Sequence, residues 1–336
     1  MANPVLIEVT RGPLVESWHR GAIAVASASG TMALQLGDVA QPIYPRSSIK
    51  ALQALPMIET GAADRFGYGS QEIALACASH TGTESHTRLA AAMLERIGLK
   101  EQALGCGAHM PLGGAAAKAL HESHREPTQF HNNCSGKHAG MLATAVHLGE
   151  TTDGYWEVDH PVQQRVLDVL VDMSCVALGP EVLGFDGCSV PNWAMPLSAL
   201  ARLFAHFVTG EGLAPERWVA VQRILAACWE HPELIAGRGC ADTVVMGELP
   251  GQVFMKTGAE GVYCGGFAEL GLGFALKIDD GAKRAAAGAT MALVEKVYPA
   301  ALGLMNRSSL KTWRGVEVGT IRSSTQLEDA LGGLKS

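Results

Sequence analysis

The segments of this chain that have the pattern of β-strands lie near its two ends, and this distribution constrains the fold most. Apolar runs typical of strands occur at residues 5–10, 16–26 and 31–36, and again at 252–256, 262–267 and 272–278. Small and polar residues at 27–30 form a turn, which predicts an antiparallel hairpin near the N-terminus. Antiparallel strands from both ends can therefore share one sheet, with helices on its faces.

The middle of the chain is expected to be mainly helical. Apolar residues recur at helical spacing, and the expected helices cover residues 47–55, 84–97, 113–121, 140–148, 161–173, 197–208, 215–230 and 285–297. No repeat, low-complexity tract or long linker interrupts the pattern. The sequence predicts an α/β (α+β) fold in a single unit over residues 1–336, with a helical subregion at about 80–240, whereas the tail after about 300 is less informative.

Composition excludes several classes of function. Lys and Arg total 26 against 33 Asp and Glu, a net charge of −7, and no basic stripe suggests nucleic acid binding. Mean hydropathy is only +0.14, and no apolar run is long enough to cross a bilayer. The first residues lack the pattern of a signal peptide, so we expect a cytoplasmic protein whose eight cysteines are reduced, with some of them candidate metal ligands.

Ser47 and Lys50 form a possible nucleophile and base at the start of the expected helix over 47–55. Three residues apart, they share one face of a helix. The helix dipole and burial both lower a lysine pKa, so a neutral amine could take the serine proton. A capping serine beside a solvent-facing lysine has the same spacing, so the pair alone does not establish catalysis.

Lys256-Thr257-Gly258 is a second candidate motif, at the end of an expected strand. The glycines that follow let backbone amides approach a carboxylate or an oxyanion, although a hairpin turn with a surface lysine is the alternative. Together with Ser47-x-x-Lys50, this motif resembles penicillin-recognising serine hydrolases. Their Ser-Asp-Asn element is missing here, which argues against a β-lactam substrate.

Three further segments carry reactive side chains. Ser79, followed by His80, is either structural or a second nucleophile or proton relay beside another lysine. Cys134 and Lys137 would share a face at a helix start, and Cys188 comes from the loop over 186–191. Thiolates suit zinc, but spacing alone favours a pair of buried free cysteines, because free cysteines are commonly buried.

Taken together, five segments resemble the class 3, or rhizobial-type, L-asparaginases of the asparaginase II family. In chain order they are Arg-Ser-Ser-Ile-Lys at 46–50, Cys-Ala-Ser-His at 77–80, Cys-Ser-Gly-Lys-His at 134–138, Asp-Gly-Cys-Ser-Val-Pro at 186–191 and Lys-Thr-Gly-Ala-Glu-Gly at 256–261. The resemblance spans roughly residues 10 to 300. It implies a serine-β-lactamase/glutaminase-like fold and a homodimer.

The resemblance also implies roles for individual residues. Two Ser-Lys tandems map to Ser47 with Lys50 and to Ser79 with Lys256. A zinc site maps to Cys134, Lys137 and Cys188, with Asp186 beside it. Further residues in or beside these segments are expected to bind the substrate, and they are Arg46, His80, Asn133, His138, Asp186, Gly258, Ala259 and Glu260.

The expected reaction is hydrolysis of L-asparagine to L-aspartate and ammonia through an acyl-enzyme. Ser47 would attack with Lys50 as base, while Ser79 and Lys256 would relay a proton to the leaving amine. The sequence leaves open which serine attacks and what zinc does. Alternatives are a glutaminase, a penicillin-recognising hydrolase, and a zinc-binding protein without catalytic activity.

Overall fold

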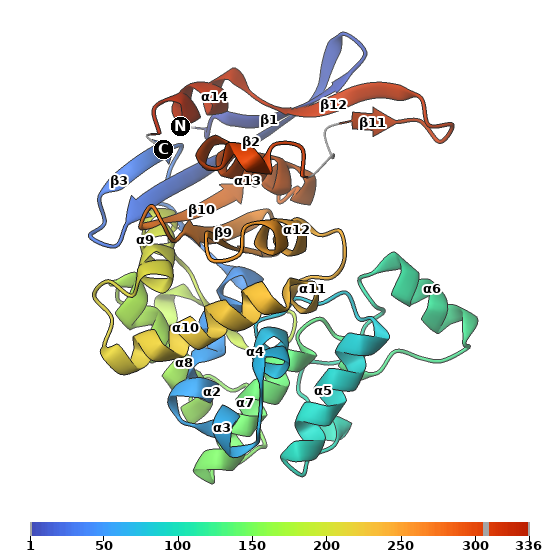
Figure 1. Cartoon of the computed structure of the whole chain (residues 1–336), viewed down its shortest axis with the longest axis vertical. Helices are drawn as coiled ribbons and strands as arrows, with labels where there is room; N and C mark the ends of the chain where they lie inside the picture. The colour runs from blue at the N-terminus through green and yellow to red at the C-terminus, as the bar shows by residue number, and fades with distance from the viewer. Residues whose placement is uncertain (1, 305–308, 335–336) are drawn as a thin grey trace. The chain divides into compact units, whose positions relative to one another are not determined.

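A single long strand joins the two ends of the chain into one sheet. In the computed structural model, which describes residues 2–304 and 309–334, β2 (Leu14–Ser27) pairs antiparallel with β1 (Val5–Arg11) and, along its second half, with β10 (Leu272–Ile278). A Cβ at Gly21, where the pairing with β10 begins, would lie 2.3 Å from the Lys277 carbonyl oxygen. Glycine therefore permits the close approach of β2 and β10 (Figure 1).

Over the described residues the sheet has eight strands, and it confirms that both ends of the chain contribute to it. Its order is β11-β12-β1-β2-β10-β9-β8, and β3 also pairs with β2. The remaining bounds are β3 (Met32–Leu36), β8 (Val253–Thr257), β9 (Val262–Phe267), β11 (Ser309–Lys311) and β12 (Glu317–Ser323). β12 pairs antiparallel with β1, so the tail that carried little signal in the sequence extends the sheet.

Helices cover both faces of this sheet. The paired residues Gly266 and Gly273 have no side chain, which lets α9 (Leu197–Thr209) pack directly on β9 and β10. Side chains alternate along a strand, so Phe267 faces the other side, where it contacts Tyr298 at the end of α13 (Lys283–Val297). α14 (Thr325–Gly332) lies beside β1, and the short strands β4 (Pro42–Ile43) and β7 (Met195–Pro196) pair with each other.

The described chain divides into two compact units. The sheet and its helices belong to the first, made of residues 1–48, 194–212 and 255–336 where described. The second comprises residues 49–193 and 213–254 and is mainly helical. Its helices are α1 (Lys50–Gln53), α2 (Leu55–Glu59), α3 (Ala62–Arg65), α4 (Ser70–Ala76), α5 (Glu84–Arg96), α6 (Gly114–Glu122), α7 (Ser135–Leu148), α8 (Pro161–Ser174), α10 (Pro215–Glu230), α11 (Pro232–Ile235) and α12 (Ala241–Glu248).

Helix α7 forms the centre of the second unit. It packs against α2, α3, α4, α5 and α8, and its residues from Ser135 to Ala145 are buried. A Cβ at Gly136 would lie 2.3 Å from the Leu75 carbonyl oxygen, and one at Gly140 would lie 3.1 Å from the Met57 sulfur. The small residues of α7 therefore bring neighbouring helices close to its first turn.

Gly136→Ala is expected to lower the free energy of unfolding by about 2 kcal/mol or more, because the new methyl group must displace the backbone of α4. Gly114→Ala is the matched control, since no atom lies within 4 Å of the added Cβ in α6. Urea unfolding of both variants measures the difference. Equal stability of the two would contradict this description of the packing.

Three local features differ from the predictions. The helix expected over 47–55 is divided into a 3₁₀ turn (Arg46–Ile49), α1 and α2, with Pro56 in the first turn of α2. α7 begins at Ser135 rather than 140, so Lys137 and His138 are helical. The loop over 186–191 connects the short paired strands β5 (Leu183–Phe185) and β6 (Pro191–Trp193), and its last residue already lies in β6. None of the described helices is long and apolar enough to span a membrane.

Candidate functional site

Ser47 lies in the 3₁₀ turn of the first unit, in a strained segment. Arg46 has a φ of 55°, a left-handed conformation that is costly for a residue with a side chain. Both Arg46 and Ser47 are half-buried, whereas Ser48 is buried and its hydroxyl donates to the Pro45 carbonyl oxygen at 2.8 Å. The Ser48 hydroxyl is therefore used in a structural hydrogen bond, whereas the Ser47 side chain is half-buried.

The Lys256-Thr257-Gly258 segment lies beside this turn in the same unit. A Cβ at Gly258 would come within 2.9 Å of the Pro45 carbonyl oxygen, which explains the glycine. Lys256 is fully buried in β8 and its Nζ donates to the Thr257 carbonyl at 3.0 Å. Burial raises the pKa of the nearby Cys264 thiol to about 12, although contacts with Ser48 and Lys256 oppose the shift.

The turn after Gly258 contains two further candidate residues, which differ in their exposure to solvent. Ala259 is half-buried, whereas Glu260 is exposed and has a φ of 56°. The Glu260 carbonyl oxygen accepts from Lys277 Nζ at 2.8 Å, and its carboxylate lies beside Gly281. Within the first unit, the Glu260 side chain thus contacts the turn that follows β10.

Lys50 links two of the predicted motifs within the second unit. It is 1% exposed, and its Nζ donates to the Ala78 carbonyl at 2.6 Å and to the Asn133 carbonyl at 3.1 Å. Ala78 immediately precedes Ser79, and Asn133 immediately precedes Cys134. One buried amine therefore holds together the backbone segments that carry the second serine and the cysteine cluster.

Ser79 has a fixed main chain and a buried hydroxyl. Its backbone N–H donates to the Ile235 carbonyl at 2.8 Å, which fixes the main chain. Its Oγ is buried and has no hydrogen-bond partner within the described residues. A buried hydroxyl without a partner is energetically costly and needs an explanation.

His80 is fully committed to protein partners. Its Nδ1 accepts from the Gly82 N–H at 3.1 Å, so the proton lies on Nε2, which donates to Ser135 Oγ at 2.9 Å. Ser135 Oγ in turn donates to the Phe130 carbonyl at 3.1 Å. Burial lowers the pKa of His80 well below its ordinary value and keeps the ring neutral. These hydrogen bonds tie the segment that follows Ser79 to the start of α7.

The residues predicted to bind zinc converge at Cys188. Cys134 is the residue before α7, Lys137 lies in its first turn, and Cys188 lies in the loop after β5. Lys137 Nζ donates to Cys188 Sγ at 3.1 Å, and Cys134 also hydrogen-bonds Cys188. All three side chains are buried.

Two neighbouring side chains hold this cluster in place. Asn132 accepts the Cys134 N–H at 2.8 Å and donates to the Cys106 carbonyl at 2.7 Å, which fixes the start of α7. Asp186 is half-buried and accepts from the Asn192 amide at 2.9 Å, so it lies across the β5–β6 hairpin from Asn192.

Contacts among Cys134, Lys137 and Cys188 shift the pKa values of all three side chains. The hydrogen bond from Cys134 lowers the pKa of Cys188 to about 5 against the effect of burial, and the Lys137 charge adds to it. The same hydrogen bond, with burial, raises the pKa of Cys134 to about 12. Burial alone would lower the pKa of Lys137, but Cys188, Cys134 and Asp186 raise it above its ordinary value. These shifts favour a Cys188 thiolate paired with the Lys137 ammonium.

This donor set fits a zinc ion. Two sulfurs and one amine already meet at one buried point, and soft thiolate ligands suit zinc. Over residues 2–304 and 309–334, no group of three His, Cys, Asp or Glu side chains could hold a metal, so a zinc site here would depend on Lys137 as its third donor. Zinc would require loss of the Lys137 proton, and three protein ligands would leave one position open.

His138 and Tyr155 lie against the cluster. Tyr155 Oη hydrogen-bonds His138 Nδ1 at 2.5 Å and accepts the Gly105 N–H at 2.9 Å. Burial, followed by the Lys137 charge, lowers the pKa of His138 to about 3. Tyr155 carries no motif in the sequence, and only the fold reveals its position.

The structure thus groups the sequence candidates by unit. Lys50, Ser79, His80, Asn133, Cys134, Lys137, His138, Asp186 and Cys188 belong to the second unit, and Arg46, Ser47, Lys256, Gly258, Ala259 and Glu260 to the first. Sequence reasoning missed Asn132, Ser135, Tyr155 and Asn192. Asn132 and Ser135 stand within or beside a recognised motif, so their neighbours could have indicated them.

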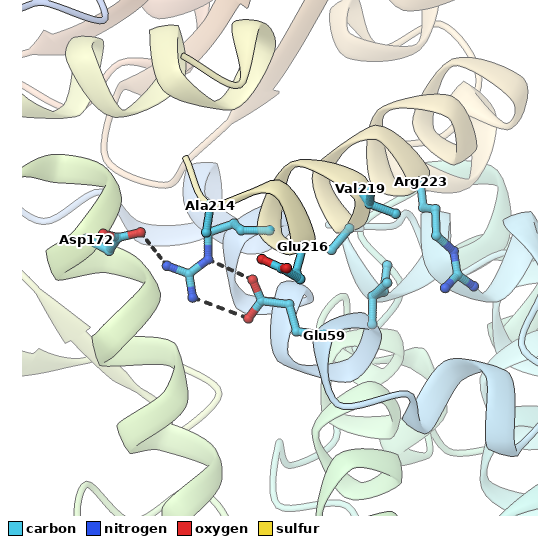
Figure 2. A pocket seen from close by; sticks show the side chains of 9 residues that line it. Glu59, Asp172, Ala214, Glu216, Val219 and Arg223 are labelled. Atoms are coloured by element: carbon cyan, nitrogen blue, oxygen red, sulfur yellow. Dashed lines mark hydrogen bonds and ion pairs between the residues drawn. The ribbon is translucent and has the colours of Figure 1, made fainter. Parts of the chain in front are cut away.

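A hollow in the second unit is lined by none of these candidate residues. It measures about 560 Å³ and is lined by residues that include Glu59, Asp172 and Arg217. Arg217 donates to Glu59 at 2.7 Å and to Asp172 at 2.5 Å (Figure 2), so its charge is neutralised by ion pairs. Ion pairs among its own lining residues therefore occupy these three charged groups of the hollow.

Comparisons with known proteins indicate the family. The model of the family described as L-asparaginase II matches residues 7–323. No curated protein matches the chain. Among solved structures, a beta-lactamase from Mycobacterium bovis is 11% identical, with a TM-score of 0.36, and the match covers 84% of this chain and 92% of that chain.

Proposed function

The chain belongs to the L-asparaginase II family, and on that premise we propose that it hydrolyses the side-chain amide of L-asparagine through an acyl-enzyme. Membership supports an asparaginase-type amidohydrolase acting on a small molecule. The specific substrate and the Ser-Lys mechanism are our proposal. The observation that carries it is the buried Lys50 amine, which binds the carbonyls next to Ser79 and Cys134.

In the proposed mechanism Ser47 attacks the amide carbon and Lys50 takes its proton. A neutral amine has two N–H groups and one lone pair. The Ala78 and Asn133 carbonyls accept two N–H groups of Lys50. The lone pair of the neutral form is then left for a serine proton, which suits a general base.

Ser79 would relay a proton to the leaving amine, with Lys256 polarising it. Two observations support an active role for Ser79: its hydroxyl is buried without a partner, and its main chain is fixed by Ile235. Backbone amides near the serines would stabilise the oxyanion. Water would then hydrolyse the ester with Lys50 again as base.

Cys134, Lys137 and Cys188 would hold zinc in this proposal. Bound there, zinc would supply a positive charge that fixes the substrate's α-amino and carboxylate groups or the site itself. The family resemblance also leads us to propose a homodimer, and sedimentation velocity at several concentrations tests this. A single monomeric species at all concentrations would refute it.

Cys188→Ser is expected to lower the zinc retained after gel filtration by at least about tenfold, because one of three protein ligands loses its thiolate. Elemental analysis measures the metal per chain. Cys175→Ser is the control, since Cys175 is exposed and lies after α8. Equal zinc in both variants would remove Cys188 from the proposed site.

Ammonia release by the purified protein tests the proposed reaction. L-Asparagine, L-glutamine and a chromogenic β-lactam are compared under the same conditions with zinc supplied. We expect rapid release from L-asparagine. Preference for L-glutamine would favour a glutaminase, and β-lactam cleavage would favour a penicillin-recognising hydrolase. Inertness towards all three, with tight zinc binding, would support a non-catalytic zinc protein.

A further inference from the structure

His138 combines one paired ring nitrogen with one that has no hydrogen-bond partner. The residue lies in the second unit in α7 and is completely buried. Its Nδ1 contacts Tyr155 Oη at 2.5 Å. Its Nε2 is buried, and within the described part of the chain nothing forms a hydrogen bond of good geometry with it. Such an atom is rare in native structures and often marks a functional contact.

Tyr155 determines which nitrogen of His138 carries the proton. Tyr155 Oη accepts the Gly105 N–H at 2.9 Å, and the residue is fully buried. Its own O–H must therefore find an acceptor inside the protein, and among the residues that the structure describes His138 Nδ1 lies within hydrogen-bond distance. Because Nδ1 accepts this hydrogen bond, the ring proton lies on Nε2.

The His138 ring lies beside the zinc-binding cluster. The His138 ring interacts with the Cys188 backbone and with the charges of Lys137 and Lys50. The Cys188 backbone lies near the ring, but among the described residues Nε2 has no hydrogen-bond partner of good geometry. A proton on Nε2 prevents this atom from binding a metal, whereas it can donate to an oxygen. The Lys137 ammonium beside the ring favours an oxygen that carries negative charge.

We propose that Tyr155 is a positioning residue that holds His138 as a hydrogen-bond donor, and that its Nε2–H binds a carboxylate oxygen of the amino-acid substrate. The identity of that substrate rests on the proposed function. The resemblance suggests only that His138 contacts substrate. The proton direction, the partner Tyr155 and the chemistry of the bound group come from the hydrogen bonds above.

The tautomer can be measured without any enzymatic turnover. In protein labelled with ¹⁵N-histidine, two-bond ¹⁵N–¹H correlations identify the protonated nitrogen, and His138→Gln assigns the signals. We expect the Nε2–H form. L-Aspartate added to chelator-treated protein should shift the Nε2 resonance, whereas zinc alone should leave Nε2 protonated. An Nδ1–H tautomer, no response to L-aspartate, or loss of the Nε2 proton with zinc would each overturn the proposal.

Kinetics then test the role of Tyr155. Tyr155→Phe removes the O–H that fixes the ring, so we expect KM for L-asparagine to rise about tenfold while kcat changes less than about threefold. Tyr68→Phe is the matched control, because buried Tyr68 donates to the Met93 carbonyl at 2.6 Å. We expect Tyr68→Phe to lower the stability of the protein and to leave KM for L-asparagine unchanged. An equal KM in both variants would overturn the proposal.

The two measurements separate the two hypotheses. A protein inert towards L-asparagine would refute the proposed function, and the histidine resonances would still report the tautomer and the response to L-aspartate. An active protein with the wrong tautomer would refute the role of Tyr155 alone.

Discussion

Replacing Ser47 by alanine is expected to abolish asparagine hydrolysis while leaving the protein folded. The substitution removes the proposed nucleophile, whose loss typically lowers kcat by roughly 10⁴-fold or more. Ser47 is half-buried, so stability should change little. Ammonia release and circular dichroism of the same preparation measure both effects.

The neighbouring serine supplies a matched control. Ser48 is buried and donates to the Pro45 carbonyl at 2.8 Å, so Ser48→Ala should lower stability by about 1 kcal/mol. Its activity should stay within about tenfold of the unmodified protein. Substantial activity in Ser47→Ala, or equal losses in both variants, would remove Ser47 from the role of nucleophile.

Lys50→Met is expected to have the second largest effect, because it acts on both catalysis and stability. Loss of a general base lowers the rate about 10²- to 10⁴-fold. Methionine also leaves the Ala78 and Asn133 carbonyls without their donor, at a cost of about 1–3 kcal/mol for each buried acceptor. Steady-state kinetics and urea unfolding separate the two contributions.

Lys277→Met tests whether the loss of activity follows merely from unpaired carbonyls. Lys277 Nζ also donates to two backbone carbonyls, those of Glu260 and Ile278, but the residue is half-buried. We expect a smaller loss of stability and activity within about tenfold of the unmodified protein. If Lys50→Met retains activity comparable to that of Lys277→Met, Lys50 does not act as the base.

The sheet could be predicted because its signals are local. Alternating or continuous apolar runs bounded by glycine identified β2, β9 and β10, and the presence of such runs at both ends implied one sheet. β12 escaped prediction because its residues are half-exposed and lack a clear apolar face. Its pairing with β1 depends on a contact more than 300 residues away in the sequence, which no local pattern reports.

The candidate site was predictable only where reactive residues occur in short motifs. Cys134 and Lys137 stand in one such motif, and the structure places them in contact with Cys188. The early start of α7 was missed because the Asn132 side chain, rather than helical periodicity, fixes that end of the helix. Tyr155 acts through a single hydroxyl on a segment without any motif, so its contact with His138 could be found only in three dimensions.

The most direct test of the central claim is to identify the covalent intermediate. The protein is mixed with L-asparagine, quenched in acid during turnover, digested, and its peptides are examined by mass spectrometry. We expect an aspartyl ester on the peptide that contains Ser47, and none in Ser47→Ala. An ester on the peptide that contains Ser79, or consumption of L-asparagine without any ester, would contradict the proposed mechanism.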